Sequence, residues 1–241
     1  MNYTFRFAPV LSRLDQLLDG LVVTLWITAL AIAAGFALGV AGALIARSRH
    51  TWARRIVQAY VEAIRNTPLL AQLFFVYFGL PGIGLRLDAY VAAIITLVVN
   101  LGAYTTEIVR GGIDSVPHGQ IDAGTALGLT RLQVFFLIVL KPALQTMFPA
   151  LASQFTLLML STSILSQIGV TDLFHMASLI DSTTYRSFEV YAVTCGFYLA
   201  LALTFRLGFA LIYWWAFSRQ VSTRGRGDTA MLPEPAIVAA P

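Results

Sequence analysis

Residues 21–45, LVVTLWITALAIAAGFALGVAGALI, contain no charged side chain, and the charge-free run extends from Gly20 to Ala46. A hydrocarbon core about 30 Å thick requires roughly 20 consecutive apolar residues in a helix. The run is long enough to cross a bilayer once, with a turn to spare at each end. It predicts a transmembrane helix and sets the expectation for the remainder of the chain.

The composition supports a protein with several such helices. Of the 241 residues, 58% are hydrophobic and only 12% are charged, whereas soluble domains carry about 25% charged residues. The formal net charge of +4 fits the Arg and Lys that membrane proteins keep in cytoplasmic loops. The sequence has no basic run interleaved with aromatic residues, so a nucleic-acid partner is not expected.

Charge-poor segments predict where the chain crosses. We expect an all-α protein with five transmembrane helices, at about residues 20–46, 57–85, 89–110, 143–171 and 190–217. The last segment is interrupted by Arg206, for which the sequence suggests only snorkelling or pairing. Residues 1–19 precede the membrane domain of residues 20–217, and the Pro/Gly/Ala-rich tail, residues 218–241, is expected to be disordered.

The basic residues predict the orientation of these helices, because cytoplasmic loops carry an excess of Lys and Arg. Ten basic residues fall on one side of the predicted membrane: Arg47, Arg49, Arg54, Arg55, Arg110, Arg131, Lys141, Arg219, Arg224 and Arg226. Four fall on the other: Arg6, Arg13, Arg86 and Arg186. The sequence therefore predicts an N-terminus outside and a C-terminus in the cytoplasm.

Residues 113–142, here called the projecting loop, contain too many helix-start and helix-stop signals for a membrane segment. Ser115 before Val116-Pro117 is a plausible helix N-cap, and Gly128 is suited to the residue just after a helix end. Thr130 and Gln133 have the spacing of a capping box that starts a second short helix. Two short helices joined at Gly128 are therefore expected on the cytoplasmic side.

The second of these helices is expected to be separate from the fourth span. Its apolar run, Leu132–Leu140, would extend only about 14 Å, and Lys141-Pro142 should interrupt the helix. Along the first helix Gly119, Ala123, Gly124 and Ala126 are small, so another surface could approach the backbone closely. The loop is either a connector lying on the membrane surface or a docking element for a cytoplasmic partner.

The projecting loop resembles the EAA loop of ABC-importer permease subunits, whose core is roughly E-A-A-x-x-x-G followed by I-x-L-P. Here the motif reads Asp122-Ala123-Gly124, then Gly128, then Ile138-Val139-Leu140. Asp replaces Glu, Gly replaces the second Ala, and the proline comes one place late, after Lys141. The acidic group, the small surface and the glycine turn are retained.

Four further segments are similar to the polar amino-acid uptake permeases within that class. They are LLDGLVVTLWIT (residues 17–28), EAIRNTPLLAQLFFVYFGLP (62–81), NLGAYTTEIVRGGIDSVPHGQ (100–120) and LLMLSTSILSQIGVTDL (157–173). Leu160-Ser161 stand where that family commonly has a Lys-Asp pair. The resemblance implies a multi-pass protein of the bacterial inner membrane, with residues 1–19 in the periplasm, working by alternating access.

The resemblance also implies the partners. They are a second permease subunit in a homo- or heterodimer, two copies of a P-loop ATPase, a periplasmic substrate-binding protein, the lipid bilayer and a polar amino acid. The residues expected to contact the ATPase are Gly119, Gln120, Asp122, Ala123, Gly124, Gly128 and Thr130.

The chain is not expected to be an enzyme or to hold a cofactor. A P-loop requires Gly-Lys-Ser/Thr, and the only lysine, Lys141, is followed by Pro142. ATP with Mg²⁺ is expected on the separate ATPase chain. His50, His118 and His175 are scattered along the sequence, so no metal site is predicted.

Polar residues within spans are candidates for the substrate pathway, because burying ionisable groups in a membrane is costly. Glu107 shares a helix face with Asn100 and Tyr104, although a simple ion pair with Arg110 at i,i+3 remains an alternative. Thr67, Pro68 and Leu69 interrupt the second span and could line a cavity, or form an ordinary proline kink. Ser161, Thr162 and Ser163 add hydroxyls that are as often used between helices.

Three other functions remain open. A permease for another small solute is the nearest, because the projecting loop does not identify the cargo. A secondary transporter would need internal repeats or several coupling carboxylates, and five spans with one buried acid fit this poorly. A scaffold subunit would leave the polar pathway unexplained.

Overall fold

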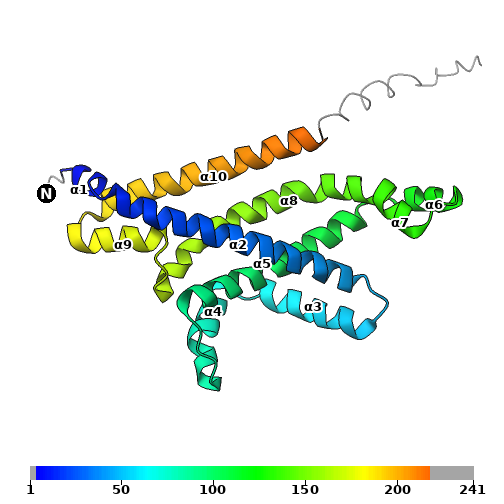
Figure 1. Ribbon diagram of the computed structural model, residues 1–241, viewed down its shortest axis with the longest axis horizontal. Helices are drawn as coiled ribbons and strands as arrows, with labels where there is room; N and C mark the ends of the chain where they lie inside the picture. Colours follow the sequence, from blue (N-terminus) through cyan, green and yellow to red (C-terminus); the bar gives the residue numbers. More distant parts are fainter. Residues whose placement is uncertain (1–3, 218–241) are drawn as a thin grey trace, which may run out of the picture.

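The computed structural model describes residues 4–217, and all the regular elements in this part of the chain are helices (Figure 1). In chain order the helices are α1 (Ala8–Leu11), α2 (Leu14–Ala46), α3 (Thr51–Arg65), α4 (Leu69–Phe74), η1 (Phe75–Gly79), η2 (Leu80–Ile83), α5 (Ala89–Asp114), α6 (His118–Ala126), α7 (Arg131–Val134), η3 (Phe135–Val139), α8 (Leu140–Ser161), η4 (Thr162–Ile168), α9 (Leu173–Thr184) and α10 (Ser187–Phe217). Of these, η1 and η3 are π-helical turns and η2 and η4 are 3₁₀-helical. The tail predicted to be disordered, residues 218–241, lies outside the described residues.

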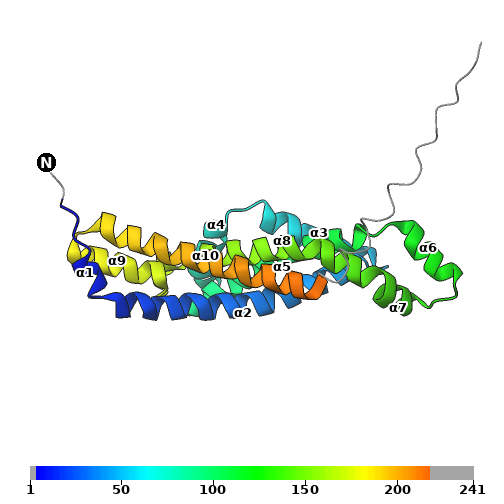
Figure 2. The same cartoon turned by 90° about the horizontal axis from the view of Figure 1, so that it is seen from above.

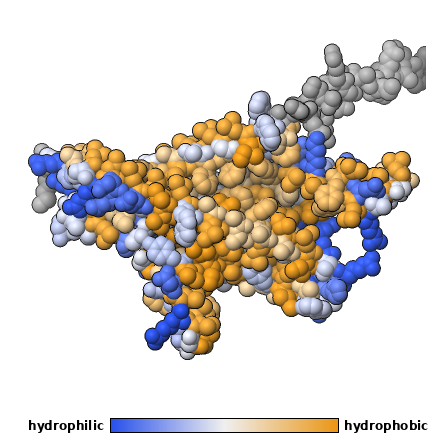
Figure 3. Space-filling view, in the orientation of Figure 1, coloured by the Kyte–Doolittle hydropathy of each residue, from blue (hydrophilic) through white to orange (hydrophobic). Residues whose placement is uncertain are grey.

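The long helices run lengthwise in an elongated bundle. α1 and α9 lie at one end, and α6 and α7 project from the other (Figures 1 and 2). Hydrophobic residues cover the middle of the molecule, whereas hydrophilic residues gather toward its ends (Figure 3). This distribution matches a bilayer crossing the middle of the bundle.

Four helical stretches are long and apolar enough to cross a membrane: Leu14–Ala46, Ala89–Asp114, Arg131–Ile168 and Ser187–Phe217. They correspond to the predicted first, third, fourth and fifth spans. The all-α membrane architecture is thus confirmed, although the described part of the chain contains four such helices where five spans were predicted.

The predicted second span, residues 57–85, is not one helix. α3 ends at Arg65, and Pro68 adopts an extended conformation with ψ of 137° before α4 begins. Proline disfavours a helical conformation in the residue before it and cannot donate its own backbone hydrogen bond. The following apolar stretch, Leu69–Ile83, is shorter than a spanning helix. It extends away from the bundle axis (Figure 1), and we call it the lateral arm.

The predicted break at Lys141-Pro142 was wrong, because the helix runs on from Arg131 to Ile168. A π-helical turn, Phe135–Val139, comes just before the proline. The carbonyl four residues before Pro142 belongs to Ile138, which lies inside this turn, where bonding follows i→i+5 in place of i→i+4. The helix therefore already departs from α geometry at the point where proline cannot donate.

The core of the bundle is the crossing of α2 and α5. A Cβ atom on Gly39 would lie 2.3 Å from Cβ of Thr105, and one on Gly42 would lie 2.4 Å from the hydroxyl oxygen of Thr106. The Thr106 hydroxyl also lies 3.2 Å from the carbonyl oxygen of Gly39. Small residues of this kind let membrane helices approach closely enough for backbone packing and short polar contacts.

The end of the bundle near α1 is held by α9. The backbone N–H of Leu173 donates to the Thr24 hydroxyl of α2 at 3.1 Å. The buried Asp172 side chain caps α9 by accepting from the backbone N–H of His175 at 3.0 Å. Burial raises the pKa of the Asp172 carboxyl to about 6, so this cap keeps its proton to higher pH than an exposed aspartate would.

We predict that Gly39→Ala destabilises the bundle by about 1–3 kcal/mol, the usual range for overpacking, because the new methyl group would collide with Thr105. Thermal unfolding of the purified protein in mild detergent, followed by tryptophan fluorescence, measures the effect. Gly208→Ala is the matched control, since a Cβ on Gly208 meets no atom within 4 Å. Equal unfolding temperatures for the two variants would contradict the assigned helix crossing.

Candidate functional site

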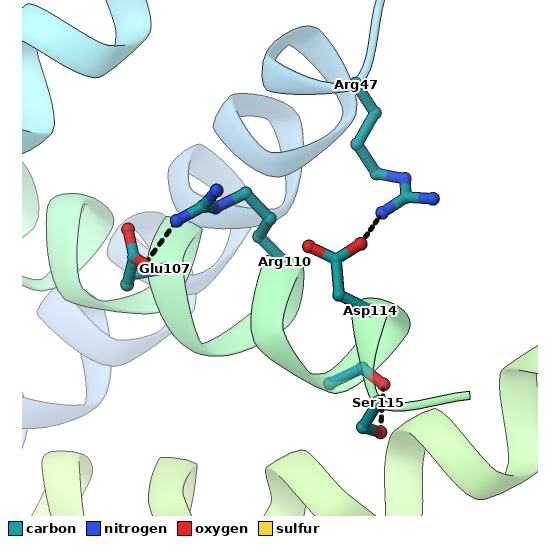
Figure 4. Close-up of polar contacts among 6 residues, drawn as sticks. Arg47, Glu107, Arg110, Asp114 and Ser115 are labelled. Atoms are coloured by element: carbon teal, nitrogen blue, oxygen red, sulfur yellow. Dashed lines mark hydrogen bonds and ion pairs between the residues drawn. The ribbon is translucent and has the colours of Figure 1, made fainter. Parts of the chain in front are cut away.

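The projecting loop begins later than the sequence predicts. α5 continues to Asp114 and the Ser115 hydroxyl donates back to the Gly112 carbonyl at 2.7 Å (Figure 4). Ser115 therefore ends α5 and does not cap α6, which starts at His118 after Pro117. Pro117 explains why α6 starts at His118. The fixed φ of proline is suited to the residue just before a new helix.

Local chemistry at the turn between α6 and α7 is as predicted. Gly128 has a φ of +80°, a conformation that costs other residues free energy. Its N–H donates to the Thr125 carbonyl at 3.0 Å, and the Leu129 N–H donates to the Gly124 carbonyl at 3.2 Å. These two bonds form a Schellman motif, and Thr130 with Gln133 forms the predicted capping box.

A small core of its own holds the loop in shape. Val116, Val134, Val139 and Ala143 are buried together, with Ile121 and Leu129 packed against them. Gly124 belongs to this inner side, because a Cβ there would lie 2.4 Å from Cδ1 of Ile138. Its small size thus serves packing within the loop, and its expected contact with an ATPase stays a prediction.

The outer side of the loop combines the other predicted residues with an apolar tip. Gly119, Gln120, Asp122, Ala123, Gly128 and Thr130 are exposed. Leu127 is 82% exposed and Leu132 is 72% exposed, and sequence reasoning did not select either one. The available signal was their position on both sides of Gly128, at the turn between the two expected helices.

Several predicted pathway residues lie together where α3, α4 and α5 meet. The break at Thr67-Pro68 exposes backbone groups, and the Gln72 amide nitrogen lies 2.8 Å from the Ile64 carbonyl and 3.1 Å from the Thr67 carbonyl. The Gln72 oxygen in turn accepts from the amide of Asn100 at 2.9 Å. Gln72 thereby links the helix break to α5, and sequence reasoning missed it.

One turn further along α5, Tyr104 and Glu107 meet arginines. The Arg65 guanidinium lies 5.4 Å from the centre of the Tyr104 ring and 3.6 Å from the Glu107 carboxylate. Glu107 also pairs with Arg110 at 2.5 Å (Figure 4). The ion pair considered from the sequence is therefore present, and Arg65 is an additional member of it.

We call this set the polar cluster: Arg65, Thr67, Gln72, Asn100, Tyr104, Glu107 and Arg110. Glu107 and Arg110 also line a polar cavity of about 430 Å³ between α3 and α5, together with Arg54, Arg55 and Glu62. Leu69 is half-buried at the start of α4. Nearby, Arg47 at the end of α2 pairs with Asp114 (Figure 4).

The serine and threonine group of the fourth span does not join the polar cluster through hydrogen bonds. Ser161, Thr162 and Ser163 donate to the carbonyls of Leu157, Met159 and Leu160 in their own helix at 2.8, 2.7 and 2.9 Å. Thr162 is also fully buried. These hydroxyls satisfy themselves locally, as such residues commonly do in apolar helices.

Residues 35–217 match the family described as binding-protein-dependent transport system inner membrane component. The chain is 34% identical over 202 residues to the glutamine transport system permease protein GlnP of Escherichia coli strain K12, covering 83% of this chain and 92% of that one. It is 38% identical over 208 residues to the probable glutamine ABC transporter permease protein GlnM of Bacillus subtilis strain 168, covering 86% and 94%.

The fold is similar to a solved amino acid ABC transporter with histidines. The superposition has a TM-score of 0.83 at 34% sequence identity, and covers 88% of this chain and 99% of that one.

We predict that Gln72→Leu destabilises the protein by about 1–3 kcal/mol, because the carbonyls of Ile64 and Thr67 and the amide of Asn100 would lose their partner. The unfolding temperature in detergent measures this loss. Gln167→Leu is the control, since the exposed Gln167 makes one long contact of 3.5 Å. A stability equal to that of the control would show that the break does not depend on Gln72.

Proposed function

The chain belongs to the family of binding-protein-dependent transport inner-membrane components, and we propose that it is the permease subunit of an ATP-driven ABC importer for polar amino acids. The family match, which extends through the projecting loop and both flanking membrane helices, is the observation that carries the proposal. The chain would translocate its cargo across the bacterial inner membrane by alternating access. ATP with Mg²⁺ would be bound and hydrolysed by a separate partner.

A fifth crossing is part of the proposal. The lateral arm would complete the passage begun by α3, so that the N-terminus is periplasmic and the C-terminus cytoplasmic. Arg6, Arg13 and Arg186 belong to the end that carries α1 and α9. The end with the projecting loop has more arginines, namely Arg47, Arg49, Arg54, Arg55 and Arg131. This separation supports the orientation, because cytoplasmic ends are enriched in arginine.

The projecting loop would be the coupling loop that docks in a cleft on one of the two P-loop ATPase subunits, and the second permease subunit would engage the other. Its own buried core makes it a preformed shape, and its exposed tip at Leu127 and Leu132 supplies apolar area for a partner to cover. Asp122 and Gln120 would provide polar contacts beside this tip. A rigid loop of this kind transmits a displacement of the ATPase without absorbing it.

The lateral arm would pack on a second permease subunit in a homo- or heterodimer. Phe75, Phe78 and Ile83 are 66%, 60% and 74% exposed. The arm is too short to cross a bilayer alone, so a neighbouring chain would bury part of this surface. A periplasmic binding protein would deliver the amino acid at the opposite end, near α1 and α9.

The polar cluster would line the substrate pathway, with Thr67, Asn100, Tyr104 and Glu107 as the contacting residues and Pro68 and Leu69 shaping the break. Its mixed charge suits a zwitterion, whose ammonium group could approach Glu107 and whose carboxylate could approach Arg65 or Arg110. Ser161, Thr162 and Ser163 would contribute only carbonyls and packing, since their hydroxyls are already bonded. Importers of other small solutes share the same coupling loop, so cargo is the part of the proposal to test separately.

For the coupling role, we predict that Gly128→Val reduces binding-protein-stimulated ATP hydrolysis at least about tenfold, because a β-branched residue is strained at a φ of +80°. The measurement uses the complete complex in proteoliposomes, and native mass spectrometry counts the ATPase subunits that remain bound. Gly196→Val is the control, since a Cβ there meets no atom within 4 Å. Normal hydrolysis by correctly inserted Gly128→Val protein would refute the docking role.

For the pathway role, we predict that Glu107→Gln changes the KM for uptake at least about fivefold, or reverses the preference between cationic and neutral amino acids. Uptake of radiolabelled glutamine and arginine into the same proteoliposomes provides the measurement. Asp114→Asn is the control, because it breaks an ion pair at the end of α5 beyond the polar cluster. If Glu107→Gln lowers only the unfolding temperature, Glu107 is a structural partner of Arg65 and Arg110.

A further inference from the structure

A cleft of about 740 Å³ separates α8 from α10 and is not part of the polar cluster. The residues that line it on α10 include Leu199, Ala202, Leu203, Arg206 and Ala210, a spacing that places them on one face of the helix. One face of α8, which includes Pro149, Ala152, Ser153 and Thr156, forms the other wall. The cleft therefore lies between facing sides of the two long helices α8 and α10.

Aromatic contacts close one end of this cleft. Phe148 of α8 lies 5.7 Å from Tyr213 and 6.2 Å from Phe217, ring centre to ring centre. Phe155 and Phe209 approach to 5.8 Å deeper in the bundle. The start of α10 packs on α9, but the most apolar 18-residue window of α10 has no buried residue. Leu157, Leu199 and Leu203 in the cleft walls are at least half exposed, so the cleft opens on the apolar outer surface of the bundle.

Arg206 is the one charged residue among those that line the cleft. It is exposed and makes no hydrogen bond or ion pair within residues 4–217. The polar residues that line the α8 wall are Ser153 and Thr156, and Thr156 already donates to the Ala152 carbonyl at 2.9 Å. The described part of the chain therefore gives the guanidinium no anion.

The depth of Arg206 identifies the kind of anion that can reach it. Trp214 and Trp215 are 68% and 81% exposed, and aromatic residues of this type lie at headgroup level. Arg206 is eight residues before Trp214, about 12 Å along the helix. An arginine side chain can extend from this depth toward the headgroups, where the common fixed anion is a phosphate.

We propose that the cleft between α8 and α10 binds an anionic phospholipid, whose phosphate pairs with Arg206 and whose acyl chain lies along Leu199, Leu203 and Leu157. Both halves of the site fit this occupant. The walls are apolar except for the hydroxyls of Ser153, Thr156 and Tyr213 and the guanidinium, and basic pockets between membrane helices at the cytoplasmic side bind anionic headgroups. The bound lipid fills the gap beside α10 and fastens this helix to α8.

The inference depends on the membrane position of α8 and α10 and is independent of the cargo. A free amino acid fits the cleft poorly, because its ammonium group would find no carboxylate among the lining residues. A carboxylate from a second membrane protein is the competing partner for Arg206, and the experiment separates the two.

Native mass spectrometry of the full complex in mild detergent, titrated with phosphatidylglycerol or phosphatidylethanolamine, tests the site. We expect the wild type to retain phosphatidylglycerol preferentially, and Arg206→Gln to retain it about fivefold less, the change typical of one basic residue at an anionic lipid. Arg206→Lys should keep most of the binding because it keeps the charge. Arg49→Gln, at another exposed arginine without a partner in residues 4–217, is the control.

Ala202→Phe provides a second test that leaves the charge in place. The new ring would occupy the space of the acyl chain, so phosphatidylglycerol retention should fall although Arg206 is intact. This variant decides the question if Arg206→Gln does not accumulate in the membrane. Unchanged lipid retention in these variants would overturn the proposal, as would loss of a partner chain from Arg206→Gln with lipid unaffected.

Discussion

The close approach of α2 and α5 is the contact on which the remaining architecture depends. Lipid is as apolar as the helices themselves, so helices in a membrane associate through packing and short polar contacts. Gly35, Gly39 and Gly42 provide a surface without side chains, against which Leu101, Thr105 and Thr106 of α5 pack. α5 is thereby fixed along most of its length, and α3, α8 and the lateral arm are arranged around it.

This fixed helix connects the two regions for which we propose a function. Asn100, Tyr104 and Glu107 lie along α5, and the same helix ends at Asp114, within the first residues of the projecting loop. The Arg47–Asp114 ion pair also ties that end to α2. α5 is thus one continuous helix from the polar cluster to residues 115–117, which lead into α6.

Local sequence rules succeeded where local chemistry decides the structure. The four long apolar helices, the positive φ of Gly128 and the Thr130–Gln133 capping box each depend on residues close together in the sequence, and each was predicted. Ser115 was assigned to the wrong helix, because its choice between α5 and α6 depends on where Pro117 ends the preceding turn. The packing of Gly124 against Ile138 was not predicted, because Ile138 is 14 residues away and on another element.

The features that were hardest to predict are contacts between residues far apart in the sequence. Pro68 does interrupt a helix, and the interruption is stabilised by Gln72, which in turn reaches Asn100 on α5. No pattern in the sequence connects these residues. Arg65 likewise joins Glu107 from a different helix. The polar cluster could be predicted in part from Glu107 and its face of α5, whereas the side chains contributed by α3 and α4 required the structure.

The π-helical turn at Phe135–Val139 gives the chain tolerance to a change in length. Each residue of an α-helix advances the chain by about 100° around the axis, so inserting one residue normally rotates everything beyond it onto a new face. A π turn holds one extra residue in its hydrogen-bonded ring, and the rotation is contained within it. In the EAA-like motif of this chain the proline, Pro142, also comes one residue later than in the family pattern. The extra residue in the π turn and the delay of the proline are therefore equal in size. An ancestral insertion at this point would leave the projecting loop aimed in its original direction while α8 kept its packed face.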